Sequence, residues 1–106
     1  MDKFINKIMN FENEIEYSAD SVVSKIIYKG EHTILTLFAL AKGQSIAEHT
    51  TPFDALVQIL KGKADIKVGD KIHSVNQGES VIMPANVPHS LAAKEGFKML
   101  LTMMKE

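Results

Sequence analysis

The chain has 106 residues, a net charge of −1, 45% hydrophobic and 24% charged residues, and no cysteine. This length predicts a single domain, and the composition is typical of a soluble globular protein. The small net charge and the absence of a basic run argue against nucleic acid or an anionic membrane as a partner. The lack of cysteine excludes disulfides, thiolate zinc sites and a cysteine nucleophile.

The N-terminal segment is polar and acidic, with Phe4, Ile5, Ile8 and Met9 at helix-like spacing. We expect residues 1–20 to form an arm or a short helix in front of a domain at 21–106. The segment lacks the apolar core of a signal peptide, and no stretch approaches the ~20 apolar residues of a membrane-spanning helix. The sequence therefore predicts a cytoplasmic protein with no membrane partner.

From residue 22 onward the chain is typical of β-strands. Strands are predicted over 22–29, 33–40, 55–60, 64–68, 71–75, 80–83, 90–93 and 97–104. Lys61-Gly62 is interpreted as a turn, and Gly69-Asp70 as a two-residue hairpin connection. Short strands separated by Gly and Pro, without a long helix, predict an all-β sandwich or barrel. Periodicity alone leaves the type of sandwich or barrel open.

Two segments of the chain run from a glycine to a histidine. In the first, five residues separate Gly43 from His49. In the second, a strand begins after Gly78 and stops at Pro84, and His89 follows Pro88 directly. Proline cannot donate to a strand ladder and restricts the residue before it, so a stiff corner is expected there. Such a corner can direct the side chain of His89 into a cavity.

Residues 43–62 and 78–93 resemble, in this order, the first and second sequence motifs of the cupin family. The resemblance implies an all-β, cupin-type double-stranded β-helix, that is, a jelly-roll barrel, in one domain. It also implies that His49 and His89 project inward from neighbouring strands near one mouth of the barrel. Cupin enzymes include dioxygenases and isomerases, so the resemblance leaves the reaction open.

The chain departs from the cupin motifs at the usual metal ligands. The family's second histidine position is Thr51, and its glutamate position is Ala55. A first-row metal site needs three or four nitrogen and oxygen donors. Asp54 and Gln58 are poor substitutes, because their strand parity is opposite to that of Ala55.

Only His49 and His89 remain as metal ligands, so we expect at most a weakly bound divalent ion (Zn, Ni, Mn or Fe). Two further departures fall in the second motif, where Asn86 stands in place of a glycine and Ala93 in place of an asparagine.

The same positions predict an apolar pocket for a small organic molecule. Ala55 enlarges the cavity where a carboxylate would stand, and Phe38, Ile59 and Leu101 have strand parities that suit the barrel interior. The predicted pocket residues are His49, Thr51, Ala55, Val57, Met83, His89 and Leu91.

Three functions stay open. The chain is interpreted first as a small-molecule binding protein. The alternatives are a metal-dependent enzyme of the dioxygenase or isomerase class with a reduced histidine set, and a structural or regulatory oligomer. The sequence identifies no catalytic residue.

Both faces of the last predicted strand are apolar. Phe97, Met99 and Leu101 alternate with Leu100 and, further along, Met104. One face can meet the barrel core, whereas the other, together with the apolar N-terminal residues, needs cover. We therefore expect a homodimer in which the subunits protect their edge strands.

Overall fold

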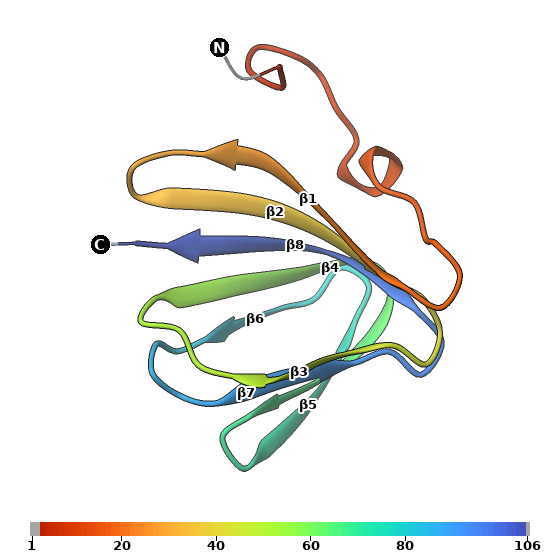
Figure 1. Cartoon of the computed structure of the whole chain (residues 1–106), viewed down its shortest axis with the longest axis vertical. Helices are drawn as coiled ribbons and strands as arrows, with labels where there is room; N and C mark the ends of the chain where they lie inside the picture. Colours follow the sequence, from red (N-terminus) through yellow and green to blue (C-terminus); the bar gives the residue numbers. More distant parts are fainter. Residues whose placement is uncertain (1–2, 106) are drawn as a thin grey trace.

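The computed structural model describes residues 3–105, and its strands follow a short 3-10 helix (Figure 1). Met1, Asp2 and Glu106, which belong to the predicted arm and barrel segments, lie outside the described residues. The elements are η1 (Phe11–Glu14), β1 (Val22–Lys29), β2 (Thr33–Leu40), β3 (Ser45–His49), β4 (Asp54–Val68), β5 (Lys71–Asn76), β6 (Ser80–Met83), β7 (His89–Ala92) and β8 (Phe97–Met104). The prediction of an all-β domain is confirmed.

The strands form one antiparallel sheet that curls on itself. Its order is β1-β2-β8-β4-β7-β3, and β5 and β6 also pair with β4. The first half of β4 pairs with β6 and β8, and the second half pairs with β5 and β7. The curl, visible in Figure 1, lets β3 and β7 enclose a core with β2 and β8.

The predicted turn at Lys61-Gly62 is wrong, because β4 runs through it as one strand of 15 residues. The pairing of β4 with β8 shifts register between Ile59 and Lys61. Gly62 follows with φ +82°, and a Cβ at this position would collide with the carbonyl oxygen of Gly96. The glycine thus bends a continuous strand where it passes between the two halves of the sheet. The hairpin at Gly69-Asp70 is confirmed, since Val68 pairs with Lys71.

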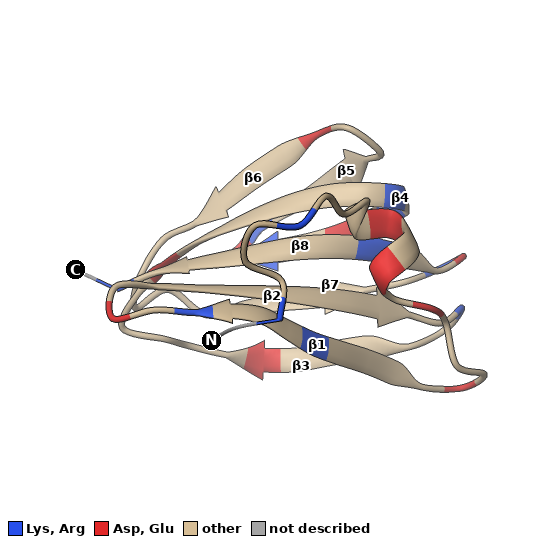
Figure 2. Ribbon diagram, turned by 90° about the horizontal axis from the view of Figure 1, so that it is seen from above, with Lys and Arg blue, Asp and Glu red and all other residues tan. Residues whose placement is uncertain are grey.

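Apolar residues fill both faces of the sheet that carries β8. The inner cluster lies inside the curl and includes Val57, Ile59, Ile66, Phe97 and Met99. A second cluster lies on the outer face and consists of Ile15, Ile27, Leu37, Ala39 and Leu100, with Phe4, Met9 and Phe11 packed against it. The N-terminal arm of the same chain therefore covers the outer face of β8, as its position over β4 and β8 in Figure 2 shows.

Two lysines fasten the arm to the sheet. The Nζ of Lys98, whose side chain is only 5% exposed, donates a hydrogen bond of 2.8 Å to the carbonyl oxygen of Glu12. Lys25 Nζ donates at 3.0 Å to the carbonyl oxygen of Glu14. Burial, and to a smaller extent the charge of Glu12, raise the pKa of Tyr17, whose ring lies 5.3 Å from Lys98 Nζ.

Within the described residues, no helix has the length and hydrophobicity needed to cross a membrane.

Candidate ligand pocket

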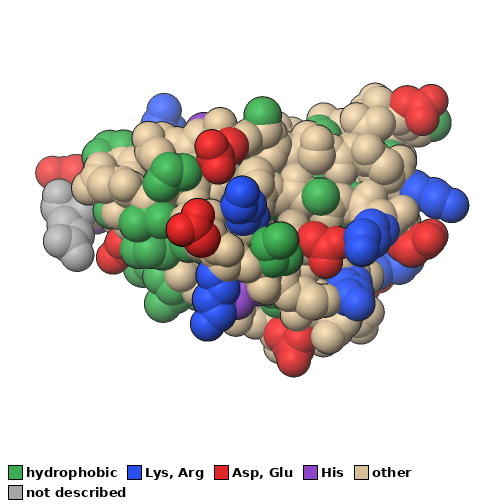
Figure 3. All heavy atoms as spheres, turned by 90° about the horizontal axis from the view of Figure 1, so that it is seen from below, with side chains coloured by type: hydrophobic (Ala, Val, Ile, Leu, Met, Phe, Trp, Pro, Cys, Tyr) green, Lys and Arg blue, Asp and Glu red, His purple; other side chains and the backbone are tan. Residues whose placement is uncertain are grey.

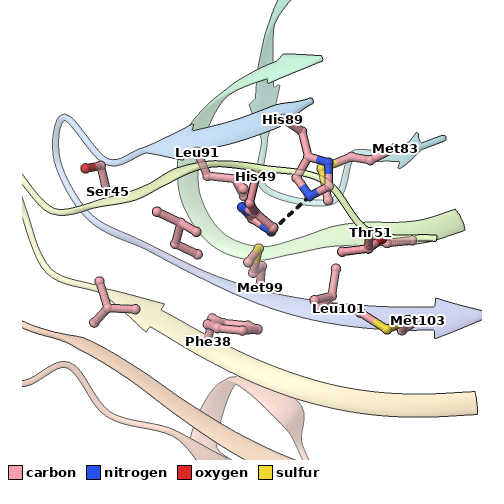
Figure 4. A pocket seen from close by; sticks show the side chains of 13 residues that line it. Phe38, Ser45, His49, Thr51, Met83, His89, Leu91, Met99, Leu101 and Met103 are labelled. Carbon is pink, nitrogen blue, oxygen red and sulfur yellow. Dashed lines mark hydrogen bonds between the residues drawn. The ribbon is translucent and has the colours of Figure 1, made fainter. Parts of the chain in front are cut away.

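A cavity of about 350 Å³ opens inside the curl of the sheet (Figure 4). No acidic side chain, lysine or arginine lines it in the described part of the chain, and its polar side chains are two histidines, a threonine and a serine. Its lining residues are Val22, Phe38, Ser45, Ile46, His49, Thr51, Ala55, Met83, His89, Leu91, Met99, Leu101 and Met103.

Most of the residues predicted for a pocket lie around this one cavity. His49, Thr51, Ala55, Met83, His89 and Leu91 all line it. Val57 does not: it lies two residues further along β4, is 0% exposed, and belongs to the inner core cluster. Ala55 and Val57 point to the same side of β4, but the cavity ends between them: Ala55 lines it and Val57 packs in the core beyond it.

Five lining residues were not among those predicted for the pocket or the barrel interior: Val22, Ser45, Ile46, Met99 and Met103. The pairing of β3 with β7 shifts register between Ile46 and His49, so the strand alternation breaks there. For this reason Ile46 and His49 both face the cavity although they are three residues apart. A strict period of two cannot predict that arrangement, and the sequence contains no glycine at the irregularity to signal it.

The two histidines meet tip to tip at the cavity wall. They are register partners of β3 and β7, and their Nε2 atoms are 3.1 Å apart, as the dashed line in Figure 4 shows. The ring centroids are 4.3 Å apart and the rings are inclined by 69°. Each Nδ1 lies at hydrogen-bond distance from a backbone oxygen two residues earlier, that of Ala47 at 2.8 Å for His49 and that of Val87 at 3.2 Å for His89.

The environments of the two rings differ. His89 is buried, with 4% of its surface exposed, whereas His49 is exposed at the rim. Burial lowers the pKa of His89, the hydrogen bond to the Val87 carbonyl partly opposes this, and the nearby His49 lowers it further. The pocket therefore favours a neutral imidazole at His89.

Asp54 and Thr51 form hydrogen bonds with the backbone of the two loops that precede β4 and follow β6. Asp54 Oδ1 accepts a hydrogen bond of 2.7 Å from the amide of Ala85. The Thr51 hydroxyl donates to the Phe53 carbonyl at 2.9 Å, and the Thr51 carbonyl accepts from the Asn86 amide at 2.8 Å. Asn86 has φ 63°, a left-handed conformation that asparagine tolerates better than most residues, which explains how it replaces the usual glycine.

The histidine pair matches two positions of a metal coordination shell, but no further His, Cys, Asp or Glu side chain of the described residues completes it. With metal–nitrogen bonds of about 2.0–2.1 Å, a separation of 3.1 Å corresponds to a ligand–metal–ligand angle of about 100°. Residues 3–105 contain no group of three or more His, Cys, Asp or Glu side chains that could hold an ion. The donors present therefore do not fit a tightly held metal.

The comparisons with known proteins agree with this architecture. The sequence profile of the cupin domain (Cupin_2) matches residues 36–104. A conserved protein of unknown function from Streptococcus pyogenes, SPY1581, is 36% identical with a TM-score of 0.89, over 95% of this chain and 89% of that one. A cupin superfamily protein from Desulfitobacterium hafniense is 27% identical with a TM-score of 0.89, over 95% of this chain and 93% of that one.

A Cupin 2 conserved barrel domain protein from Leptotrichia buccalis is 37% identical with a TM-score of 0.88, over 92% of this chain and 47% of that one. No curated protein sequence matches the chain. The fold and its inward-facing histidines define a small double-stranded β-helix protein. The chain belongs to the cupin family.

Proposed function

We propose that this cupin barrel binds a small, largely apolar organic molecule in the cavity beside His49 and His89. The observation that carries the proposal is the cavity itself, about 350 Å³ in volume and lined mainly by Leu, Ile, Val, Phe and Met. Ligand pockets of this kind combine apolar walls with a few convergent polar groups and start at roughly 300 Å³. Here the convergent polar groups are the two imidazoles.

A cavity-filling variant tests the proposal. Ala55 lines the cavity and is 3% exposed, so Ala55→Leu places added bulk inside it. Small aromatic and aliphatic molecules that raise the melting temperature of the natural protein should no longer do so in this variant. Ala47→Leu, at an exposed position of β3 outside the lining, is the control and should respond like the natural protein. Equal responses of all three proteins would contradict the proposal.

A second candidate is a metal-dependent enzyme of the dioxygenase or isomerase class. The convergence of the two Nε2 atoms favours it, and the lack of a third donor in residues 3–105 opposes it. We expect divalent ions (Zn, Ni, Mn or Fe) to bind weakly and reversibly, and His89→Ala to abolish this binding. Metal analysis of untagged protein after extensive dialysis checks the expectation. One tightly held ion per subunit would contradict the binding-protein proposal and favour the metal-dependent enzyme.

The distribution of surface charge bears on which partners the protein can have. Lysines and acidic residues of opposite sign are interspersed on the face in Figure 3, which offers no extended basic surface. We expect a cytoplasmic protein without a nucleic-acid or membrane partner, and the net charge of −1 and the mixed charges of this face agree with the lack of such partners.

A further inference from the structure

The tautomeric state of the histidine pair follows from its backbone contacts. The Nδ1 atoms of His49 and His89 lie 2.8 and 3.2 Å from the carbonyl oxygens of Ala47 and Val87. A carbonyl oxygen only accepts hydrogen bonds, so each Nδ1 must carry the ring proton for the contact to be favourable. A neutral imidazole protonated at Nδ1 has its lone pair at Nε2.

The Nε2 lone pairs of His49 and His89 consequently face each other at the cavity wall. The two Nε2 atoms are 3.1 Å apart. When both rings are neutral and carry their proton at Nδ1, neither Nε2 has a hydrogen to donate across this contact. Within residues 3–105, neither Nε2 receives a hydrogen bond from a protein donor other than its partner ring. The cavity thus presents two acceptors side by side, and a donor group that enters this apolar site can hydrogen-bond to them.

The rest of the lining restricts the charge of a suitable donor. The side chains around the pair include Met83, Met99 and Leu91, which are 1–3% exposed, and the described lining holds no acidic side chain to balance an ammonium group. An anionic group would find no lysine or arginine in the described lining to balance its charge. Charged head groups of either sign are therefore poorly accommodated.

We infer that the occupant of this cavity carries a neutral hydrogen-bond donor, a hydroxyl or amino group, that docks on the two Nε2 atoms, and an apolar body that packs on the methionine and leucine side chains. The inference rests on the proposed function and specifies the chemical class of its ligand. The histidines would then select among apolar molecules by the donor at one end.

Three probes of similar shape test the inference on the full chain, freed of metal by a chelator and held at about pH 7.5, well above the ordinary histidine pKa of ~6.5. They are 4-methylphenol, p-xylene, in which a methyl group replaces the hydroxyl, and 4-methylbenzoate, which is an anion. Affinities are measured by titration of backbone amide signals in NMR spectra. We expect 4-methylphenol to bind about tenfold more tightly than p-xylene, which corresponds to one buried hydrogen bond of about 1.4 kcal/mol.

Two histidine variants show whether the preference comes from the pair. His89→Leu should reduce the affinity for 4-methylphenol to that for p-xylene, and His49→Leu, at the exposed rim, provides the same test with less risk to the fold. His73→Leu, a histidine outside the cavity, should keep the preference. Amide spectra report whether each variant is folded.

The outcomes separate the two claims. Equal affinity for 4-methylphenol and p-xylene would overturn the donor requirement and leave the proposed binding function standing. Tighter binding of 4-methylbenzoate would also overturn it, in favour of a charged imidazole pair. If none of the three probes binds, both the donor requirement and the proposed function are wrong.

Discussion

A buried histidine in this site links the stability of the protein to pH. The pKa of His89 is lower in the folded protein than the ordinary value of ~6.5 expected for the unfolded chain. Above that pH the residue is neutral in both states and its contribution to stability is constant. As the pH falls below it, the unfolded state binds more protons, so the free energy of unfolding decreases.

We therefore predict that His89→Gln flattens the fall of the melting temperature between about pH 7.5 and about pH 5.5. His32→Gln is the control, because the side chain of His32 is 68% exposed, and it should leave the pH dependence unchanged. Thermal unfolding at several pH values measures both. A His89→Gln protein with the full pH dependence of the natural one would show that other titratable groups cause it.

At the residue scale, the sequence was informative where strand parity holds. It brought Ala55, Met83 and Leu91 together with the two histidines, and it rejected Asp54, whose carboxylate binds the backbone of the next corner. It failed at Ile46, because a register shift is set by the pairing of two strands and not by either strand alone. The depth of the cavity, which excludes Val57, likewise depends on packing between distant segments.

At the scale of elements, glycine has two different uses in this chain. Gly43 and Gly62 have nearly the same φ, +83° and +82°. Around Gly43 a Cβ would meet no atom within 4 Å, whereas at Gly62 it would collide with the backbone of Gly96. Substituting Gly43 and Gly62 in turn therefore distinguishes the free-energy cost of a left-handed backbone from the added cost of a steric collision.

We predict that Gly43→Ala lowers the free energy of unfolding by about 1–2 kcal/mol, the cost of the left-handed conformation. Gly62→Ala should lose at least about 2 kcal/mol more, since a backbone collision is added to the same strain. Urea denaturation of the two variants compares them under identical conditions. Equal losses would mean that β4 can move away from Gly96 without cost.

The strand boundaries show where prediction from the sequence succeeds and where a glycine misleads it. The boundaries of β1, β2 and β8 were predicted correctly, because each is an apolar run that ends at a turn residue or at the chain's polar end. The Lys61-Gly62 step was interpreted as a turn, because a glycine with positive φ gives the same sequence signal in a turn and in a bent strand. Only the pairing of β4 with both halves of the sheet distinguishes the two cases.

At the scale of the whole molecule, the arm meets part of the need for cover that motivated the homodimer prediction. It packs on Leu100 within the same chain. Apolar side chains nevertheless remain exposed on the arm, β1 and β6, with exposed fractions of 104% for Ile8, 57% for Ile26 and 58% for Ile82. Surfaces of this kind commonly lie at subunit interfaces, so the homodimer stays our proposal.

We predict a mass in solution of twice the 11.7 kDa of one chain, measured by light scattering at tens of micromolar. Ile82→Lys should shift the equilibrium toward monomers, because it places a charge on the exposed β6 surface. Ile72→Lys changes a residue on the β4–β5 hairpin that is 70% exposed, more than Ile82, and serves as the control. A monomeric natural protein would contradict the proposal.

The sharing of β4 between both halves of the sheet determines how the barrel can open. Strand β4 pairs with β5, β6, β7 and β8. If one half of the sheet separates from β4, the hydrogen bonds between β4 and the other half also become exposed to solvent. The amides of Val57 and Ile66 should therefore exchange with solvent only when the whole protein unfolds, whereas β3, at the end of the sheet, can detach at lower free energy. Since β3 carries His49, local fraying of this strand would widen the mouth of the cavity while the rest of the barrel stays closed.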